Sequence, residues 1–139
     1  MTPEAKAAIV GAGIVALTFI VVIIKIGYRR APMRIKKSKY QAKWKKLQAY
    51  CKDKKTWPEA LTSADELLDK ALIKRGYKGK NMGERLVNAQ KKFTDNDSMW
   101  FGHKLARKVE EDPELKLKEK DVKDALLGIG QALKDLGAL

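Results

Sequence analysis

Few side chains in this sequence could carry out proton transfer or nucleophilic chemistry. The chain of 139 residues contains one histidine, His103, and one cysteine, Cys51. His103 is the natural candidate for proton transfer near neutral pH, and on a helix Trp100 and Arg107 would each lie about one turn away from it. Catalysis would also need a nucleophile or carboxylate within reach, and no spacing indicates one. We therefore interpret His103 as a structural, hydrogen-bonded histidine.

A second candidate for chemistry is the run Met82-Gly83-Glu84-Arg85, which follows a glycine-containing loop whose N–H groups could face an anion. The run lacks the spacing of a P-loop or of a dinucleotide-binding fingerprint. The simpler interpretation is a helix start, with Glu84 near the positive end of the helix dipole. Arg85 would then pair with an acid across the bundle: Asp65, Glu66 or Asp69. The candidate binding surface consists of Gly83, Glu84, Arg85, Trp100, His103 and Arg107.

Metal and redox chemistry have little support in the sequence. A single cysteine excludes an intramolecular disulfide and is typical of a reducing compartment. One histidine and one cysteine do not supply the ligands of a zinc site, and no loop of the EF-hand type is present. We expect no catalytic residues, no metal and no cofactor, and we do not expect an enzyme.

The N-terminal segment has the composition of a membrane anchor. Residues Ala7–Ile24 form 18 consecutive residues without a charge, rich in Ile, Val, Leu and Phe. That length is enough for a helix to cross the hydrocarbon layer. A cleaved signal peptide would have a shorter apolar region, preceded by its charged end. We therefore predict a single transmembrane helix within residues 1–30.

The charges that flank this segment predict its orientation. Glu4 and Lys6 precede the segment, whereas a cluster of Lys and Arg residues follows it. By the positive-inside rule the N-terminus lies outside and the C-terminal domain lies in the cytoplasm, at the cell membrane. Ala8, Ala12 and Ala16 recur at a spacing of four, so they could allow a homo-oligomer through one helix face.

The net charge of +13 is concentrated in one segment. Between Lys25 and Lys55 there are 13 basic residues and one acidic residue, a net charge of +12, whereas residues 56–139 carry 16 basic and 15 acidic residues. Ala31-Pro32 should interrupt the chain, and a helix should begin near Met33 or Arg34. Within residues 31–55 one apolar stripe lies opposite a basic surface, which predicts an amphipathic juxtamembrane helix. The stripe consists of Tyr40, Trp44, Leu47 and Cys51.

Three interpretations of this basic segment remain open. Anionic lipid attracts basic residues that directly follow a membrane span, and the residues assigned to lipid contact are Arg29, Arg30, Arg34, Lys36, Lys37, Lys39 and Lys43. Alternatively, the charges serve only as a topology signal and a solvated helix face, while the apolar stripe packs on the domain. The third interpretation is nucleic-acid binding, although Lys outnumbers Arg and no base-reading motif is present.

The remaining residues, 56–139, predict a helical bundle. Thr56-Trp57-Pro58-Glu59 is typical of a helix start, and Gly76 of a helix end. A short helix should cover Met82–Lys92, and Asp95-Asn96-Asp97-Ser98 should cap another that ends at Asp112-Pro113. A final helix is expected over Glu119–Leu136, weakened locally by Gly128 and Gly130. The predicted fold class is therefore all-α.

Several short motifs occur in an order that resembles a known helical domain: Trp57, the run 64–69, Gly76-Tyr77, the run 82–86, Trp100 and His103-Lys104. Over most of Lys43–Leu136 the chain resembles a domain of membrane-anchored proteins from candidate-phyla bacteria such as Saccharibacteria. These proteins resemble, distantly, the HEPN helical bundles, some of which are ribonucleases with an Arg followed a few residues later by a His. The resemblance implies an Arg-Asn pair near Ala106 and Arg107 and a histidine at about Glu111. This sequence has no histidine after His103, so the resemblance implies a degenerate HEPN-like module.

These observations predict a noncatalytic, single-pass membrane protein that presents a cytoplasmic helical interaction domain. Its expected partners are anionic lipid, through the basic segment, and a protein, through the bundle. The alternative function is a membrane-tethered nucleic-acid-binding or degenerate HEPN-like module.

Overall fold

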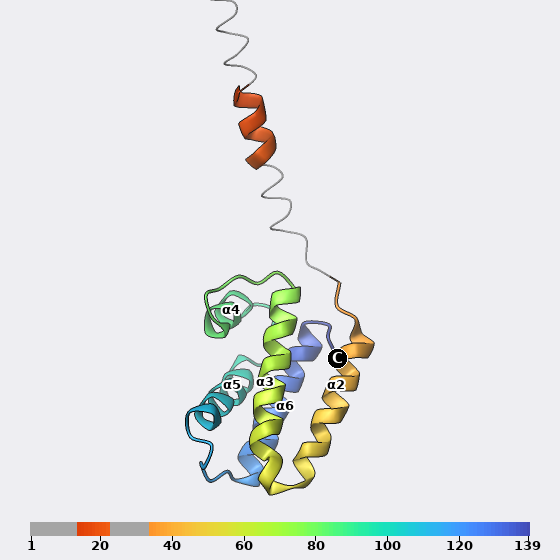
Figure 1. The fold of residues 1–139 in the computed structure, drawn as a ribbon, viewed down its shortest axis with the longest axis vertical. Helices are drawn as coiled ribbons and strands as arrows, with labels where there is room; N and C mark the ends of the chain where they lie inside the picture. The colour runs from red at the N-terminus through yellow and green to blue at the C-terminus, as the bar shows by residue number, and fades with distance from the viewer. Residues whose placement is uncertain (1–13, 23–33) are drawn as a thin grey trace, which may run out of the picture. The chain divides into compact units, whose positions relative to one another are not determined.

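The computed structural model describes residues 14–22 and 34–139, and all the regular structure within them is helical, which confirms the predicted all-α class. The chain divides between Pro32 and Met33 into two units, each of which is described by itself. The helices of the second unit are α2 (Lys37–Ala49), the 3-10 turns η1 (Tyr50–Lys52) and η2 (Lys54–Thr56), α3 (Trp57–Lys74), α4 (Met82–Asn88), α5 (Asn96–Glu111) and α6 (Glu119–Asp135) (Figure 1).

In the first unit the structure describes one helical stretch, residues 14–22, whose side chains are all exposed. No helix among the described residues is long and apolar enough to cross a membrane. Most of the predicted span, including Ala8 and Ala12, lies outside the described residues. Arg29 and Arg30, which were assigned to lipid contact, also lie outside them.

Helix α3 is the centre of the second unit, and its ends are those that the sequence predicted. Pro58 occupies the first turn, where its missing N–H costs nothing. At the other end Gly76 has a φ of +82°, a left-handed conformation that favours glycine. The N–H of Gly76 donates to the Ile73 carbonyl at 3.0 Å, and the N–H of Tyr77 donates to the Leu72 carbonyl at 3.1 Å. These bonds satisfy carbonyls at the helix end and stop α3 there.

Helices α5 and α6 pack closely against each other and against α3. Glycines permit this approach: a Cβ on Gly102 would lie 2.6 Å from the Ala125 carbonyl oxygen, and one on Gly128 would collide with the Ser98 carbonyl. The sequence indicated Gly128 only as a weak point of the last helix. In the fold it is the place where the backbones of α5 and α6 come together.

Helix α2 packs on α3 with the apolar stripe that the sequence predicted. Tyr40 and Leu47 are buried, and Trp44 is half-buried. Two details of the prediction were wrong. The helix begins at Lys37 rather than near Met33 or Arg34, and Cys51 lies in η1 beyond the helix end. The apolar residues of α2 belong to the core of the second unit, so α2 is a fixed part of that unit.

Helix α4 is shorter than predicted, since it ends at Asn88 rather than near Lys92. Leu86, Ala89 and Phe93 are nevertheless buried, as their spacing indicated. Helix α5 begins after Asp95, whose carboxylate accepts a hydrogen bond from the Ser98 N–H at 3.0 Å, and it ends at Glu111 before Asp112-Pro113. Local capping by Asp95 therefore sets the start of α5, and the helix ends where Asp112-Pro113 was expected to end it.

Candidate functional site: a basic cleft between α2 and α3

A cleft runs along the junction of α2 and α3. It comprises two neighbouring cavities of about 420 Å³ and 220 Å³, which share Lys43 of α2 and Lys70 of α3 as lining residues. We call the two together the basic cleft. Its basic lining residues are Arg34, Lys36, Lys39, Lys43, Lys46, Lys70 and Lys74.

Charge in the basic cleft is strongly unbalanced. Among the residues that the structure describes, seven basic side chains line the cleft, and the only acidic one is Glu66. Within the part of the chain that the structure describes, none of the seven forms an ion pair within 4.0 Å. The pKa of Lys43 is lowered by burial of its ammonium group and further by the positive charges of Lys70 and Lys39. A bound anion would relieve this repulsion between like charges.

Helical spacing produces the cleft. Lys39, Lys43 and Lys46 recur every three or four residues, so they share one face of α2, and Lys36 directly precedes the helix. Lys70 and Lys74 are four residues apart and share one face of α3, and the packing of α2 on α3 brings the two faces together. The sequence singled out α2 but missed Lys70 and Lys74. The signal that could have found them was their spacing on the polar side of α3.

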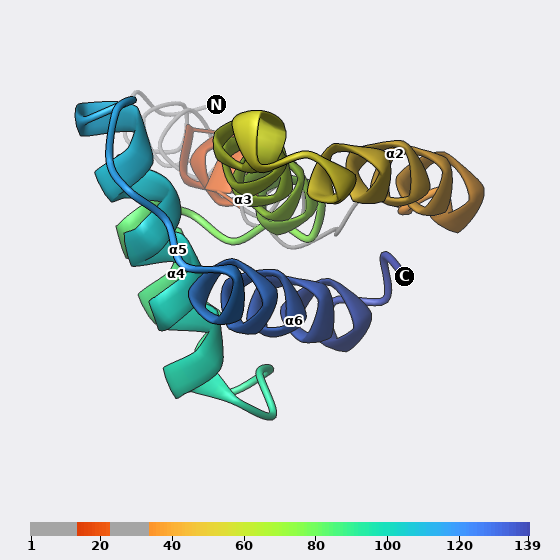
Figure 2. The ribbon, with the colours of Figure 1, turned by 90° about the horizontal axis from the view of Figure 1, so that it is seen from below.

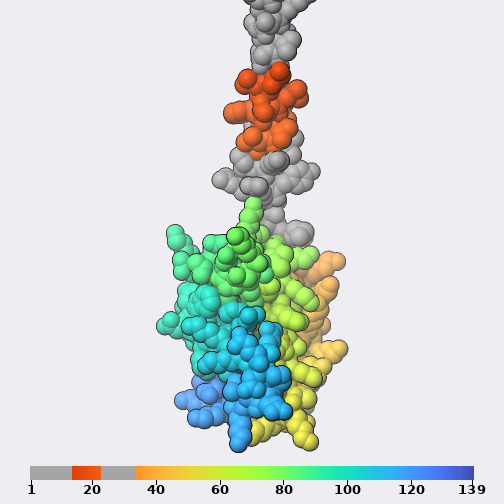
Figure 3. Space-filling model, turned by 60° about the vertical axis from the view of Figure 1, so that its left-hand side comes forward, coloured from red at the N-terminus to blue at the C-terminus, as the bar shows by residue number. Residues whose placement is uncertain are grey.

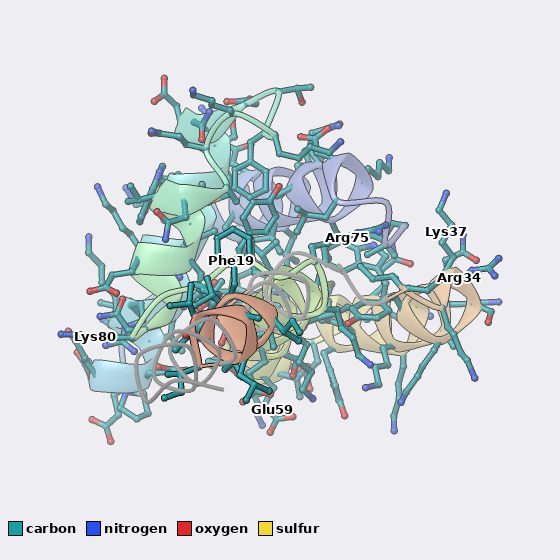
Figure 4. All side chains as sticks on the ribbon, turned by 90° about the horizontal axis from the view of Figure 1, so that it is seen from above. Phe19, Arg34, Lys37, Glu59, Arg75 and Lys80 are labelled. Carbon is teal, nitrogen blue, oxygen red and sulfur yellow. The ribbon has the colours of Figure 1, made fainter. Side chains whose placement is uncertain are left out.

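The predicted lipid-contact residues fall into three groups. Arg34, Lys36, Lys39 and Lys43 line the cleft, whereas Lys37 is exposed and is not among the lining residues. Lys37 is the first residue of α2, and Arg34, three residues before it, lies near the same end of the helix (Figure 4). Arg29 and Arg30 lie outside the described residues.

The cleft also has an apolar part. Ile73 of α3 lines it and is 51% exposed. Ile35 and Tyr40, both buried, lie beneath it. The cleft therefore combines basic side chains with one exposed aliphatic side chain.

His103 is engaged in a buried pair rather than open to a substrate. Its Nδ1–H donates to both carboxylate oxygens of Asp65 on α3, each 3.0 Å away, and the ring of Trp100 meets it edge-on at 5.8 Å. Burial raises the pKa of Asp65, with contributions from Glu110 and Asp69, against the hydrogen bond from His103, which lowers it. The structural hydrogen bond expected for His103 is present, and it joins α5 to α3.

The run Met82–Arg85 forms the start of α4, as its simpler interpretation predicted. The side chain of Asn81 accepts a hydrogen bond from the Glu84 N–H at 2.9 Å, and the carboxylate of Glu84 accepts one from the Lys80 N–H at 2.7 Å. Arg85 donates from Nε and one terminal nitrogen to Asp69, at 2.7 and 2.9 Å. An anion bound at this run, as considered from the sequence, would have to compete with these hydrogen bonds for the Glu84 N–H and the Arg85 guanidinium.

The remaining candidates of the predicted surface do not gather into one pocket. Arg107 is exposed and approaches only Glu110, at 3.5 Å, and Gly83 lies within the first turn of α4. Among the described residues no group of three His, Cys, Asp or Glu side chains could hold a metal ion. The candidate binding surface predicted from the sequence is therefore not a single site in the second unit.

No known protein family, no curated protein and no solved structure matches this chain.

Proposed function

We propose that this chain is a noncatalytic, single-pass membrane-anchored protein whose helical unit holds anionic lipid at the basic cleft. The observation that carries the proposal is the lining of the cleft, with seven basic side chains and one acidic. Each basic residue held near an anionic membrane surface contributes about 1 kcal/mol, so a cleft of this charge would bind such a surface strongly.

The anchor rests on the uncharged run Ala7–Ile24 and the basic residues that follow it. In support, residues 14–22 are helical, and their large apolar side chains, such as Phe19 at 68%, are exposed. The proposed orientation has the N-terminus outside and the helical unit in the cytoplasm, where anionic lipid is available. A tether to the membrane raises the effective lipid concentration at the cleft.

Two experiments test this proposal. Residues 33–139, which contain their own core, would be sedimented with neutral vesicles and with vesicles that contain an anionic phospholipid. We expect binding only to the anionic vesicles, and less of it at high salt, because screening weakens charge attraction. The full chain should stay in the membrane fraction after an alkaline wash. Release by the wash would contradict the anchor, and equal binding to both vesicles would contradict the cleft.

The same cleft favours one alternative, a membrane-tethered nucleic-acid-binding or degenerate HEPN-like module, because lysines neutralise nucleic-acid phosphates as well as lipid phosphates. A titration with RNA and DNA at the same salt distinguishes the two. Tight nucleic-acid binding without vesicle binding would favour the alternative. RNA hydrolysis that disappears in His103→Ala would overturn the noncatalytic assignment.

A further inference from the structure

The basic cleft has two parts of unequal volume. The wider part, of about 420 Å³, lies between the beginning of α2 and the end of α3. The narrower part, of about 220 Å³, lies nearer the 3-10 turns that connect the two helices. Because α2 and α3 run in opposite directions side by side (Figure 1), the two parts follow one another along both helices.

Each part has basic side chains of its own, and both parts share Lys43 and Lys70. Lys46 lines only the narrower part, whereas Lys39 and Lys74 line only the wider part. Burial lowers the pKa of Lys43, and the positive charges of Lys70 and Lys39 lower it further. The two shared lysines therefore lie near each other, where the two parts of the cleft meet.

The spacing of the lysines along α2 sets the distance between the two parts. Lys39 and Lys46 are seven residues apart, or about 10 Å along the helix axis, and Lys43 lies between them. Two anionic groups, one in each part, would therefore be separated by less than about 10 Å. An ammonium group has three N–H donors, so one shared lysine can contact both anionic groups at the same time.

We propose that the basic cleft binds two phosphate groups of one molecule, one in each part, with Lys43 and Lys70 between them. The ligand is a molecule whose two phosphates are joined by a few atoms, as in a diphosphatidyl lipid head group or a soluble bisphosphate. Once the first phosphate is bound, the second is held beside its own part at a high effective concentration. The inference rests on the proposed function, since it names the class of anionic lipid that the cleft holds.

The arrangement of the lysines distinguishes this site from a uniformly charged surface. On such a surface each basic residue contributes separately, whether or not the phosphates are joined. Here the lysines face each other from two helices and are divided between two parts. Glu66 lines only the narrower part and is exposed, so its carboxylate opposes a phosphate there and makes this part the weaker of the two.

The test uses the full chain in nanodiscs and has a lipid arm and a soluble arm. The lipid arm compares discs that contain diphosphatidylglycerol with discs that contain phosphatidylglycerol, matched in their number of phosphate groups. Native mass spectrometry measures the anionic lipid retained by each chain, and we expect about a tenfold preference for the diphosphatidyl lipid. The soluble arm titrates the chain in neutral discs with glycerol 1,3-bisphosphate and with glycerol 1-phosphate, at matched phosphate concentration and ionic strength.

Single variants separate the two parts of the cleft. Lys46→Gln and Lys74→Gln should each lower the affinity for the paired phosphates about fivefold, since each removes one lysine from one part. A single phosphate should be affected less, because it can bind in the other part. Glu66→Gln should raise the affinity for the paired phosphates. Lys104→Gln is the matched control, because Lys104 is an exposed lysine of α5, and α3 lies between α5 and α2 (Figure 2).

The two arms distinguish the possible sources of the phosphates. A preference in the lipid arm assigns the pair to a lipid head group, and a preference confined to the soluble arm assigns it to a soluble bisphosphate. No preference in either arm, or equal losses in Lys46→Gln and Lys104→Gln, would overturn the inference. Equal retention of the two lipids would leave the proposed anionic-lipid function standing, whereas retention of neither lipid would contradict that function.

Discussion

The two sides of α3 use charge in opposite ways. On one side Asp65 and Asp69, four residues apart, meet His103 of α5 and Arg85 of α4 at hydrogen-bonding distance. On the other side Lys70 and Lys74 lie in a cleft with the lysines of α2. The atoms of α4, α5 and the segment after α5 form a continuous surface (Figure 3).

This difference separates structural charges from charges available for binding. A paired and buried charge has its partner within the fold, so its loss should reduce stability. An exposed charge that faces like charges has no partner within the fold, so it remains available to bind an anion. We therefore expect variants on the α4–α5 side of α3 to lose stability, and variants in the basic cleft to lose binding while they stay folded.

The largest expected effect is at the contact between α5 and α6. Gly128→Ala would drive a methyl group into the Ser98 carbonyl and force α5 and α6 apart. Overpacking against backbone should cost about 3 kcal/mol in the free energy of unfolding, measured by urea denaturation. Gly83→Ala is the control, because its Cβ would meet only the Asn81 side chain, at 3.3 Å, and its effect should stay below about 1 kcal/mol. A Gly128→Ala protein of normal stability would contradict the close packing of α5 on α6.

His103→Ala should come next, with a loss of about 2 kcal/mol, because it leaves the Asp65 carboxyl buried without its donor. Burial already raises the pKa of the Asp65 carboxyl above its ordinary value, and loss of the His103 hydrogen bond raises this pKa further. The folded state then holds a proton that the unfolded state releases, so the stability of this variant should fall as pH rises above about 4. Adding Asp65→Asn should remove this pH dependence. A loss of stability that is independent of pH would show that the carboxyl is not the cause.

Arg85→Ala should cost about 1 to 2 kcal/mol, because both of its bonds to Asp69 are charge-assisted and only partly exposed. Arg107→Ala is the matched control. Arg107 and its partner Glu110 are 58% and 42% exposed, and a pair of this kind contributes less than about 0.5 kcal/mol. Equal losses of stability in Arg85→Ala and Arg107→Ala, measured by thermal denaturation, would contradict the distinction between the Arg85–Asp69 and Arg107–Glu110 pairs.

The smallest expected effect on stability is in the basic cleft. Lys70→Gln removes a charge that lowers the pKa of Lys43, so that pKa should rise towards its ordinary value. The free energy of unfolding should change by less than about 0.5 kcal/mol, as expected for an exposed position. An NMR titration of the Lys43 side chain measures the first effect and urea denaturation the second. A fall in the Lys43 pKa would contradict the proximity of the two ammonium groups.

Local features of the sequence predicted most of the helices. Pro58 and Gly76 set the ends of α3, and Asp95 sets the start of α5, because capping depends on residues within a few positions along the chain. The apolar stripe of α2 also predicted correctly which side would be buried. The first turn of α2 was placed too early, since propensity does not define where a helix begins without a capping side chain.

Of the features that depend on which helix packs beside which, the sequence predicted the pairing of Arg85 with an acid of α3, which is Asp69, but not the others. Asp65 and His103 are 38 residues apart, and no local rule joins them. Lys70 belongs to the basic cleft only because α2 packs on that side of α3. Gly128 is a poor helix former by propensity, and its value for close packing is visible only when Ser98 is placed beside it.

The most direct test of the account compares two double variants of equal net charge in their binding to anionic vesicles. Lys43→Gln with Lys70→Gln removes the two lysines shared by both parts of the cleft, whereas Lys104→Gln with Lys108→Gln removes two exposed lysines of α5. We predict that the cleft variant loses about 2 kcal/mol of binding free energy, or about thirtyfold in affinity, and that the α5 variant loses far less. Equal losses would contradict the account, because they would show that total charge, and not the cleft, determines binding.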